Sequence, residues 1–184
     1  MVQVLTIVIV VLVIVILAII MLYNSIIRLN NEVENSFSQI DVQLKRRNDL
    51  IPNLIEAVKG YMKHEKTVLE NITKARSAIM SSSNIHEKAK ASNQISEALK
   101  TIFAVSENYP KLMANQNFLQ LQEELTGTEN KVSYSRQHYN DVVMKFNNKI
   151  QVFPNNTFAN ILNFKEKELF QAAESERKNI KVQF

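Results

Sequence analysis

The sequence contains no cysteine, and it has only two glycines, three prolines and three histidines among 184 residues. Without cysteine the chain can form no disulfide and perform no thiol chemistry. Sheets and barrels need many turns, and turns depend heavily on glycine and proline. The composition therefore predicts an all-α protein, built from long helices with few corners.

The same shortages exclude several kinds of catalytic site. Gly60 and Gly127 are too few for a phosphate-binding loop, a dinucleotide fingerprint or a nucleophile elbow. The segment after His64 begins like a zinc-protease helix, but Val68 stands where the second histidine ligand is required. The histidines are far apart, and none follows a glutamate at the spacing of a di-iron bundle. We therefore expect a protein that is not an enzyme and that uses no cofactor and no metal.

The basic residues are distributed along the chain. The formal net charge is +4, and lysine and arginine are scattered instead of gathered in one run. Proteins that bind nucleic acid concentrate their basic residues on one face. We expect no nucleic-acid partner.

One long apolar run is present near the N-terminus. Val4–Leu22 is interrupted only by Thr6, and as a helix it covers about 29 Å, the thickness of the hydrocarbon core of a bilayer. A signal peptide would need a basic n-region, a shorter apolar run and a small-x-small cleavage site, and this segment has none of these. We predict an uncleaved transmembrane anchor over residues 1–24, with residues 4–22 in contact with lipid.

The flanking charges predict the orientation of the anchor. Arg28 follows the apolar run, whereas no basic side chain precedes it. By the positive-inside rule, we expect a single-pass protein of the cell membrane with its N-terminus outside and the remainder in the cytoplasm.

The first helix is expected to continue out of the membrane. No helix breaker separates Leu22 from the next apolar stripe, and spacings of three and four place that stripe on one helix face. Its residues are Ile26, Leu29, Val33, Phe37, Ile40 and Leu44. A charged run interrupts the stripe, which resumes at Ile51, and Pro52 predicts a kink or a break around Asn48–Ile51.

Further stripes predict three more helices. The first of them ends near Ile79, the second runs from about Ile85 to Ser106, and the third runs from Phe118 to Ile150. A polar loop over residues 81–84 separates the first two, and residues 153–156 end the third. We expect the longest stripe to be the spine of the core, with Phe146 buried and with Gln137 and Asn147 facing solvent.

These helices favour an elongated antiparallel bundle over residues 25–156. Residues 157–184 are expected to form a short amphipathic segment and a tail. Within them, Phe158–Phe164 fits either of two roles, a patch at the membrane interface or a cap over the end of the bundle.

A dense patch of both charge signs lies beside the proline. Its residues are Asp41, Lys45, Arg46, Arg47, Asp49 and Pro52. The patch is either a solvated bend or a surface that pairs with another copy or another helix, and the second interpretation is favoured. On that interpretation Arg46 and Arg47 contribute little to folding.

Several motifs resemble those of the LemA family of bacterial membrane proteins. They are NSFSQIDVQLKRRNDLIPN (35–53), LIEAVKGY (54–61), HE (64–65), EELTGTENK (123–131), RQHYND (136–141), FPNN (153–156) and KVQF (181–184). Phe37 occupies a position that is often tryptophan in the family. The resemblance implies an N-terminal membrane helix, a small external N-terminus, a cytoplasmic helical bundle and no known catalytic activity.

Two functions are compatible with this sequence. The first is a structural protein that self-associates, as a homo-oligomer, or recruits other membrane or cytoplasmic proteins. The second is a sensor or adaptor bundle that binds a small ligand or peptide and signals through its first helix, with Pro52 and Gly127 as natural hinges.

Overall fold

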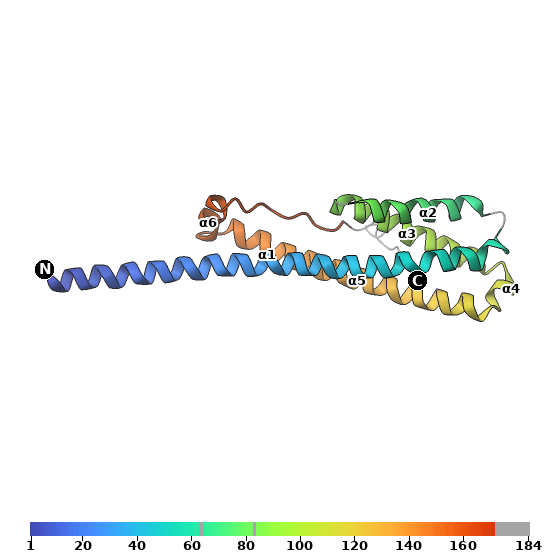
Figure 1. Cartoon of the computed structure of the whole chain (residues 1–184), viewed down its shortest axis with the longest axis horizontal. Coiled ribbons are helices and arrows are strands. Elements are labelled where there is room, and N and C mark those ends of the chain that lie inside the picture. The colour runs from blue at the N-terminus through green and yellow to red at the C-terminus, as the bar shows by residue number, and fades with distance from the viewer. Residues whose placement is uncertain (63–64, 83, 172–184) are drawn as a thin grey trace, which may run out of the picture. The chain divides into compact units, whose positions relative to one another are not determined.

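The computed structural model describes residues 1–62, 65–82 and 84–171, and all regular secondary structure in these ranges is helical. The helices are α1 (Val2–Lys59), α2 (Lys66–Ser81), α3 (Ile85–Ser106), α4 (Pro110–Met113), α5 (Gln116–Gln151) and α6 (Asn155–Ile161) (Figure 1). The all-α prediction is confirmed. His64 and the final Lys181–Phe184 lie outside the described residues, as does most of the expected C-terminal tail.

The chain divides into two compact units. The first, called the anchor unit here, consists of residues 1–37 and 139–169, and the second, called the core unit, consists of residues 38–138 and the chain from Phe170 onward. The helices α1 and α5 each contribute one end to each unit.

Helix α1 joins the apolar run to the first bundle helix without interruption, as expected from the lack of a breaker. Every residue from Met1 to Met21 is exposed, and burial begins with half-buried Leu22 and fully buried Ile26. Among the described residues, α1 is the one helix long and apolar enough to cross a membrane. Its apolar end has no protein neighbour to cover it, which is the state expected of a lipid-facing segment.

Pro52 does not break α1, so of the two expected alternatives, a kink or a break, the break is wrong. A proline has no N–H to donate to the carbonyl four residues earlier, which here belongs to Asn48. Arg76 of α2 supplies the missing donor, because its Nε lies 3.1 Å from Asn48 O. The Asn48 side chain returns a bond of 3.5 Å to Arg76 O. A side chain from a neighbouring helix thus satisfies the carbonyl that the proline leaves open.

In the core unit, α2 and α3 pack side by side (Figure 1), and the apolar stripe of each helix is buried. The buried residues of α2 are Ile72, Ala75 and Ile79, as the stripe predicts. Asn84 caps α3 by accepting a bond of 2.8 Å from His86 N, and Asn115 caps α5 by accepting 2.9 Å from Asn117 N. The short helix α4 was not predicted, and Pro110 occupies its first turn, where no N–H is needed.

In the anchor unit, aromatic rings fill the interior. Phe146 is fully buried, and its ring lies 6.2 Å from that of Phe164. The Phe37 and Tyr139 rings are 5.8 Å apart. The position that is often tryptophan in the resembling family therefore holds an aromatic contact with α5.

Helix α6 ends in a turn that sends the chain back along α5. Asn163 has φ 57°, and Phe164 N donates to Ala159 O while Asn163 N donates to Asn160 O. This is the bonding pattern of a Schellman motif, in which asparagine tolerates the left-handed conformation. The following extended segment, residues 164–169, is called the return segment here.

The return segment is fastened to α5 through its backbone. Asn147 donates from Nδ2 to Lys167 O and accepts at Oδ1 from Lys167 N, both at 2.9 Å. Tyr139 donates to Glu168 O at 2.9 Å, and burial, assisted by the Glu168 charge, raises the pKa of Tyr139 to about 12. The expectation that Asn147 faces solvent is wrong, because periodicity along α5 cannot reveal a strand-like partner further along the chain.

Candidate functional site

Arg47 lies in the interior of the core unit. It follows Leu44 by three positions and precedes Ile51 by four, so it occupies the core-facing stripe of α1, and it is 0% exposed. The expectation that Arg47 contributes to an exposed patch is wrong. A guanidinium stays protonated even here, so its burial requires partners.

Three side chains from two other helices supply those partners. Arg47 Nη1 donates to Ser96 Oγ at 3.1 Å and to Glu129 Oε2, and Nη2 donates to Ser92 O at 3.2 Å and to Ser92 Oγ. Arg136 also donates to Ser92 Oγ, and Ser96 donates to Glu129. We call Arg47, Ser92, Ser96, Glu129 and Arg136 the buried polar cluster.

The charges in the buried polar cluster support one another. Burial by itself would raise the pKa of Glu129, but the charge of Arg47, hydrogen bonds from Ser96 and Arg47, and the charge of Arg136 outweigh it, so the pKa lies below its ordinary value. Burial lowers the pKa of Arg47 and the adjacent carboxylate opposes that shift. Glu129 is therefore an anion held between two cations.

This arrangement is poor catalytic machinery. A general base works best with a pKa near the operating pH, whereas Glu129 is stabilised as a carboxylate and occupied by Arg47 and Ser96. Both serines are bonded inside the same network. No group of three or more metal-ligating side chains occurs in the part of the chain that the structure describes. The geometry serves packing and helix register better than chemistry.

The structure separates the other predicted patch residues. Asp41 is paired with Lys88 of α3 at 2.8 Å. Pro52 is half-buried, and Lys45, Arg46 and Asp49 are exposed. Arg47 is thus interior and Asp41 is paired with α3, so neither belongs to an exposed patch. The charged side chains that remain outward are Lys45, Arg46 and Asp49.

The outward residues share one face of α1. Val42 is 62% exposed, and Lys45, Arg46 and Asp49 follow it at three, four and seven positions, which is the spacing of one helix face. We call these four residues the outer face of α1. It combines both charge signs with an exposed apolar side chain.

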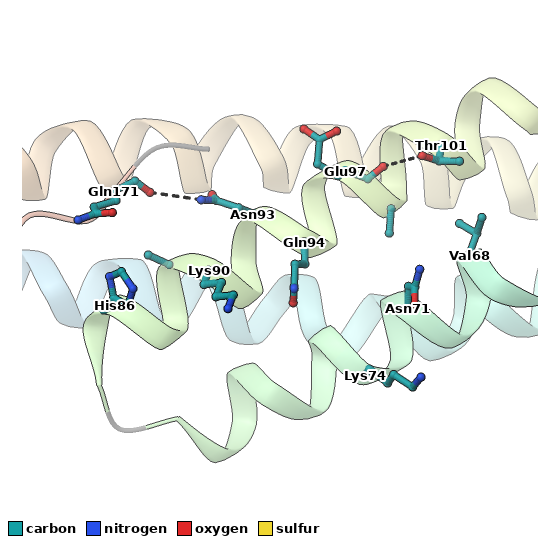
Figure 2. A pocket seen from close by; sticks show the side chains of 12 residues that line it. Val68, Asn71, Lys74, His86, Lys90, Asn93, Gln94, Glu97, Thr101 and Gln171 are labelled. Atoms are coloured by element: carbon teal, nitrogen blue, oxygen red, sulfur yellow. Dashed lines mark hydrogen bonds between the residues drawn. The ribbon is translucent and has the colours of Figure 1, made fainter. Parts of the chain in front are cut away.

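A groove of about 850 Å³ lies along α2 and α3 in the core unit. Figure 2 shows Asn71 of α2 and Gln94 of α3 extending into the space between the two helices. Lys74, His86 and Lys90 also line it, and Asn93 holds its end through a bond of 3.4 Å to Gln171 O. The groove is open, and its lining mixes polar and charged side chains with apolar ones such as Val68 and Ala98.

Sequence reasoning missed Ser92, Ser96, Glu129 and Arg136. Two signals were present. Arg47 continues the three-and-four spacing of the stripe from Ile40 to Leu54, and Glu129 and Arg136 fall within the motifs EELTGTENK and RQHYND. A charged residue at a core position predicts an opposite charge elsewhere in the core, and those motifs contain the candidates.

The chain is similar to known proteins over most of its length. A family model described as the LemA family matches residues 36–184. "Protein LemA" of Metamycoplasma hominis is 30% identical over 161 residues, which cover 85% of this chain and 72% of that protein. Magnetosome proteins MamQ 1 and MamQ 2 of Paramagnetospirillum magneticum are each 21% identical over 175 residues. The chain spans 64% of the length of each magnetosome protein.

Proposed function

Because this chain belongs to the LemA family, we propose that it is a membrane-anchored, non-enzymatic scaffold that meets another copy or a partner protein through the outer face of α1. The exposed apolar end of α1 supports the anchoring. We further propose that the N-terminus lies outside and the helical bundle in the cytoplasm, since Arg28 follows the apolar run.

The observation that carries the proposal is the division of the charged run Lys45–Asp49. Arg47 and Asn48 point inward and form hydrogen bonds to other helices, whereas Lys45, Arg46 and Asp49 are outward. Exposed charges contribute little to stability. Oppositely charged groups on one helix face do favour a complementary face over an incorrect one, and exposed Val42 adds apolar contact area.

A charge-reversal experiment tests this surface. The full chain with Lys45→Glu and Arg46→Glu is compared with the wild type in detergent by light scattering, and in membranes by cross-linking followed by recovery of bound proteins. The matched control is Lys111→Glu with Lys131→Glu, which changes the net charge equally at exposed positions outside the outer face. We expect assembly or partner recovery to fall severalfold in the first variant alone. Equal behaviour of all three proteins would contradict the proposal.

The second candidate, a ligand-binding sensor, is favoured by the groove along α2 and α3. Lys74, Lys90 and His86 line the groove together with one carboxylate, Glu97, so inorganic phosphate or citrate is a suitable probe for an anionic ligand. Binding would shift the imidazole signals of His86 in a nuclear magnetic resonance spectrum. The proposed hinge at Pro52 is less favourable, because Arg76 holds the carbonyl at that turn.

A further inference from the structure

The corner where α5 turns into α6 exposes large apolar side chains. Phe153 is 82% exposed, Ile161 74%, Val152 53% and Leu162 42%. On the other side of α6, Asn155 and Ala159 are buried. We call Val152, Phe153, Ile161 and Leu162 the apolar corner. Within the described residues of the anchor unit it is the densest such exposure apart from the transmembrane run.

The helix register shows how far along α1 the apolar corner lies. The ring contact between Phe37 and Tyr139 places these residues at one level, and α1 and α5 run antiparallel (Figure 1). Both helices rise about 1.5 Å per residue. Gln151 follows Tyr139 by as many residues as Ser25 precedes Phe37, so the end of α5 is level with Ser25.

Burial agrees with this register. Ile26 is fully buried and Leu22 half-buried, whereas all residues before Leu22 are exposed. Packing on α1 therefore begins where α5 ends. The apolar corner follows directly, so it stands at the level where the apolar run Val4–Leu22 ends, which is the boundary between acyl chains and headgroups.

Charge at this end is predominantly basic, although Glu166 of the return segment accepts a hydrogen bond of 2.8 Å from Gln151 at the end of α5. Residues 22–31 and 142–164 contain Arg28, Lys145 and Lys149 and no acidic residue. Arg28 is about 9 Å along the helix from Leu22, and Lys149, level with residue 27 by the same register, is about as near. Both distances are comparable to a Debye length of about 8–10 Å, within which an anionic membrane surface attracts cations.

We propose that the apolar corner inserts into the headgroup–acyl boundary of the leaflet from which α1 emerges, with Arg28 and Lys149 against anionic headgroups. Exposed aromatic and aliphatic side chains beside basic ones are typical of interfacial segments. Continuity with the transmembrane run favours lipid over a second copy of the chain as the occupant. This inference rests on α1 crossing the membrane, so its test must examine the two separately.

The absence of native cysteine allows single-site labelling of the full chain. Phe153→Cys carries an environment-sensitive fluorophore in vesicles of equal parts phosphatidylcholine and phosphatidylglycerol. Tyr134→Cys, at a position that is 73% exposed in the core unit, is the matched aqueous control. Val13→Cys reports whether α1 itself lies in lipid.

We expect the label at position 153 to be quenched by a nitroxide near the headgroup end of the acyl chain. Its quenching by aqueous iodide should be severalfold weaker than at position 134. Replacing phosphatidylglycerol with phosphatidylcholine, or introducing Lys149→Glu, should reduce the lipid quenching.

Four results would overturn the inference. Equal iodide quenching at positions 153 and 134 would place the apolar corner in water. Protection from iodide without lipid quenching would mean that protein covers it. If a deep acyl-chain nitroxide fails to quench the label at position 13, the anchor and the inference fail together, whereas quenching at 13 without quenching at 153 removes the inference alone.

Discussion

The two compact units of this chain bury different kinds of side chain against the long helix α1. The core unit buries charge, with Arg47 and Arg136 arranged around Glu129 and two serines. The anchor unit buries rings, with Phe37 against Tyr139 and Phe146 against Phe164. Two of its polar side chains, Asn147 and Tyr139, bond to the backbone of the return segment.

The difference has a physical consequence for specificity. Apolar rings gain free energy in proportion to buried area and tolerate small shifts in position. A buried ion pair tolerates no shift, because a displaced guanidinium loses its partners and keeps its desolvation cost. We infer that the buried polar cluster sets the register of α1, α3 and α5 in the core unit, whereas apolar burial contributes most of the stability of the anchor unit.

The largest expected effect comes from truncating the main ring of the anchor unit. Phe146→Ala should cost about 3–5 kcal/mol, the range for a buried aromatic side chain. It also removes the ring against which Phe164 and Lys167 lie. Urea unfolding of the full chain in detergent measures the loss, and hydrogen exchange should place it in residues 139–151. Gln137→Ala, at an exposed position of the same helix, should cost under about 0.5 kcal/mol.

Breaking the buried polar cluster should cost about 3 kcal/mol. Glu129→Ala leaves the fully buried Arg47 without its counter-charge, and an uncompensated buried charge is strongly destabilising. Exposed Glu123→Ala is the matched control. The double variant Arg47→Met with Glu129→Leu should recover part of the stability, since it removes both members of the ion pair and leaves only the charge of Arg136 in the cluster. Failure of the double variant to recover would mean that the charges do more than compensate each other.

Removing the backbone clamp should cost about 1–2 kcal/mol. Asn147→Ala leaves the Lys167 N–H and C=O without their partner, and unpaired backbone groups incur a desolvation cost. Hydrogen exchange should show faster exchange at Lys167 while the core unit keeps its protection. Unchanged exchange at Lys167 would contradict the role assigned to the clamp.

The buried polar cluster should also weaken in acid. The folded-state pKa of Glu129 is lowered below the ordinary value of 4.5, so its contribution to stability is complete above that value and is lost as the pH falls through the folded pKa. Unfolding curves below pH 4.5 should therefore fall more steeply for the wild type than for Glu129→Gln. Parallel pH profiles would contradict the assignment.

The smallest effect is expected at the arginine that adjoins Arg47. Arg46→Ala should change stability by less than about 0.5 kcal/mol, because Arg46 is exposed. A large loss of stability in this variant would mean that the outer face of α1 is covered in the folded protein. The proposed docking surface would then have to be occupied already, by another copy of the chain.

Arg46 and Arg47 also show where sequence reasoning reached its limit. Both were expected to face outward, because charge usually marks the solvent side of a helix. The spacing from Leu44 to Ile51 nevertheless places Arg47 on the core stripe. Glu129 lies far along the chain, and only the packing of α5 beside α1 brings it to the guanidinium.

At Pro52 and Asn147, too, the partners that decide the outcome lie elsewhere in the chain. Pro52 predicted a kink or a break because local bonding alone leaves the Asn48 carbonyl open. The helix is unbroken, and a donor from Arg76 satisfies that carbonyl. Asn147 was expected in solvent because its position is off the stripe, and the return segment made it a clamp.

The sequence by itself determined the long helices, the apolar run and the aromatic core positions of α5, since each depends on local periodicity and on the scarcity of glycine and proline. The tertiary structure alone decided which polar residues are interior, because a buried donor or charge is stable only beside a partner. Here those partners come from other helices and from the extended return segment. The burial of Arg47, the unbroken helix at Pro52 and the hydrogen bonds of Asn147 therefore depend on long-range contacts. Local sequence patterns do not contain that information.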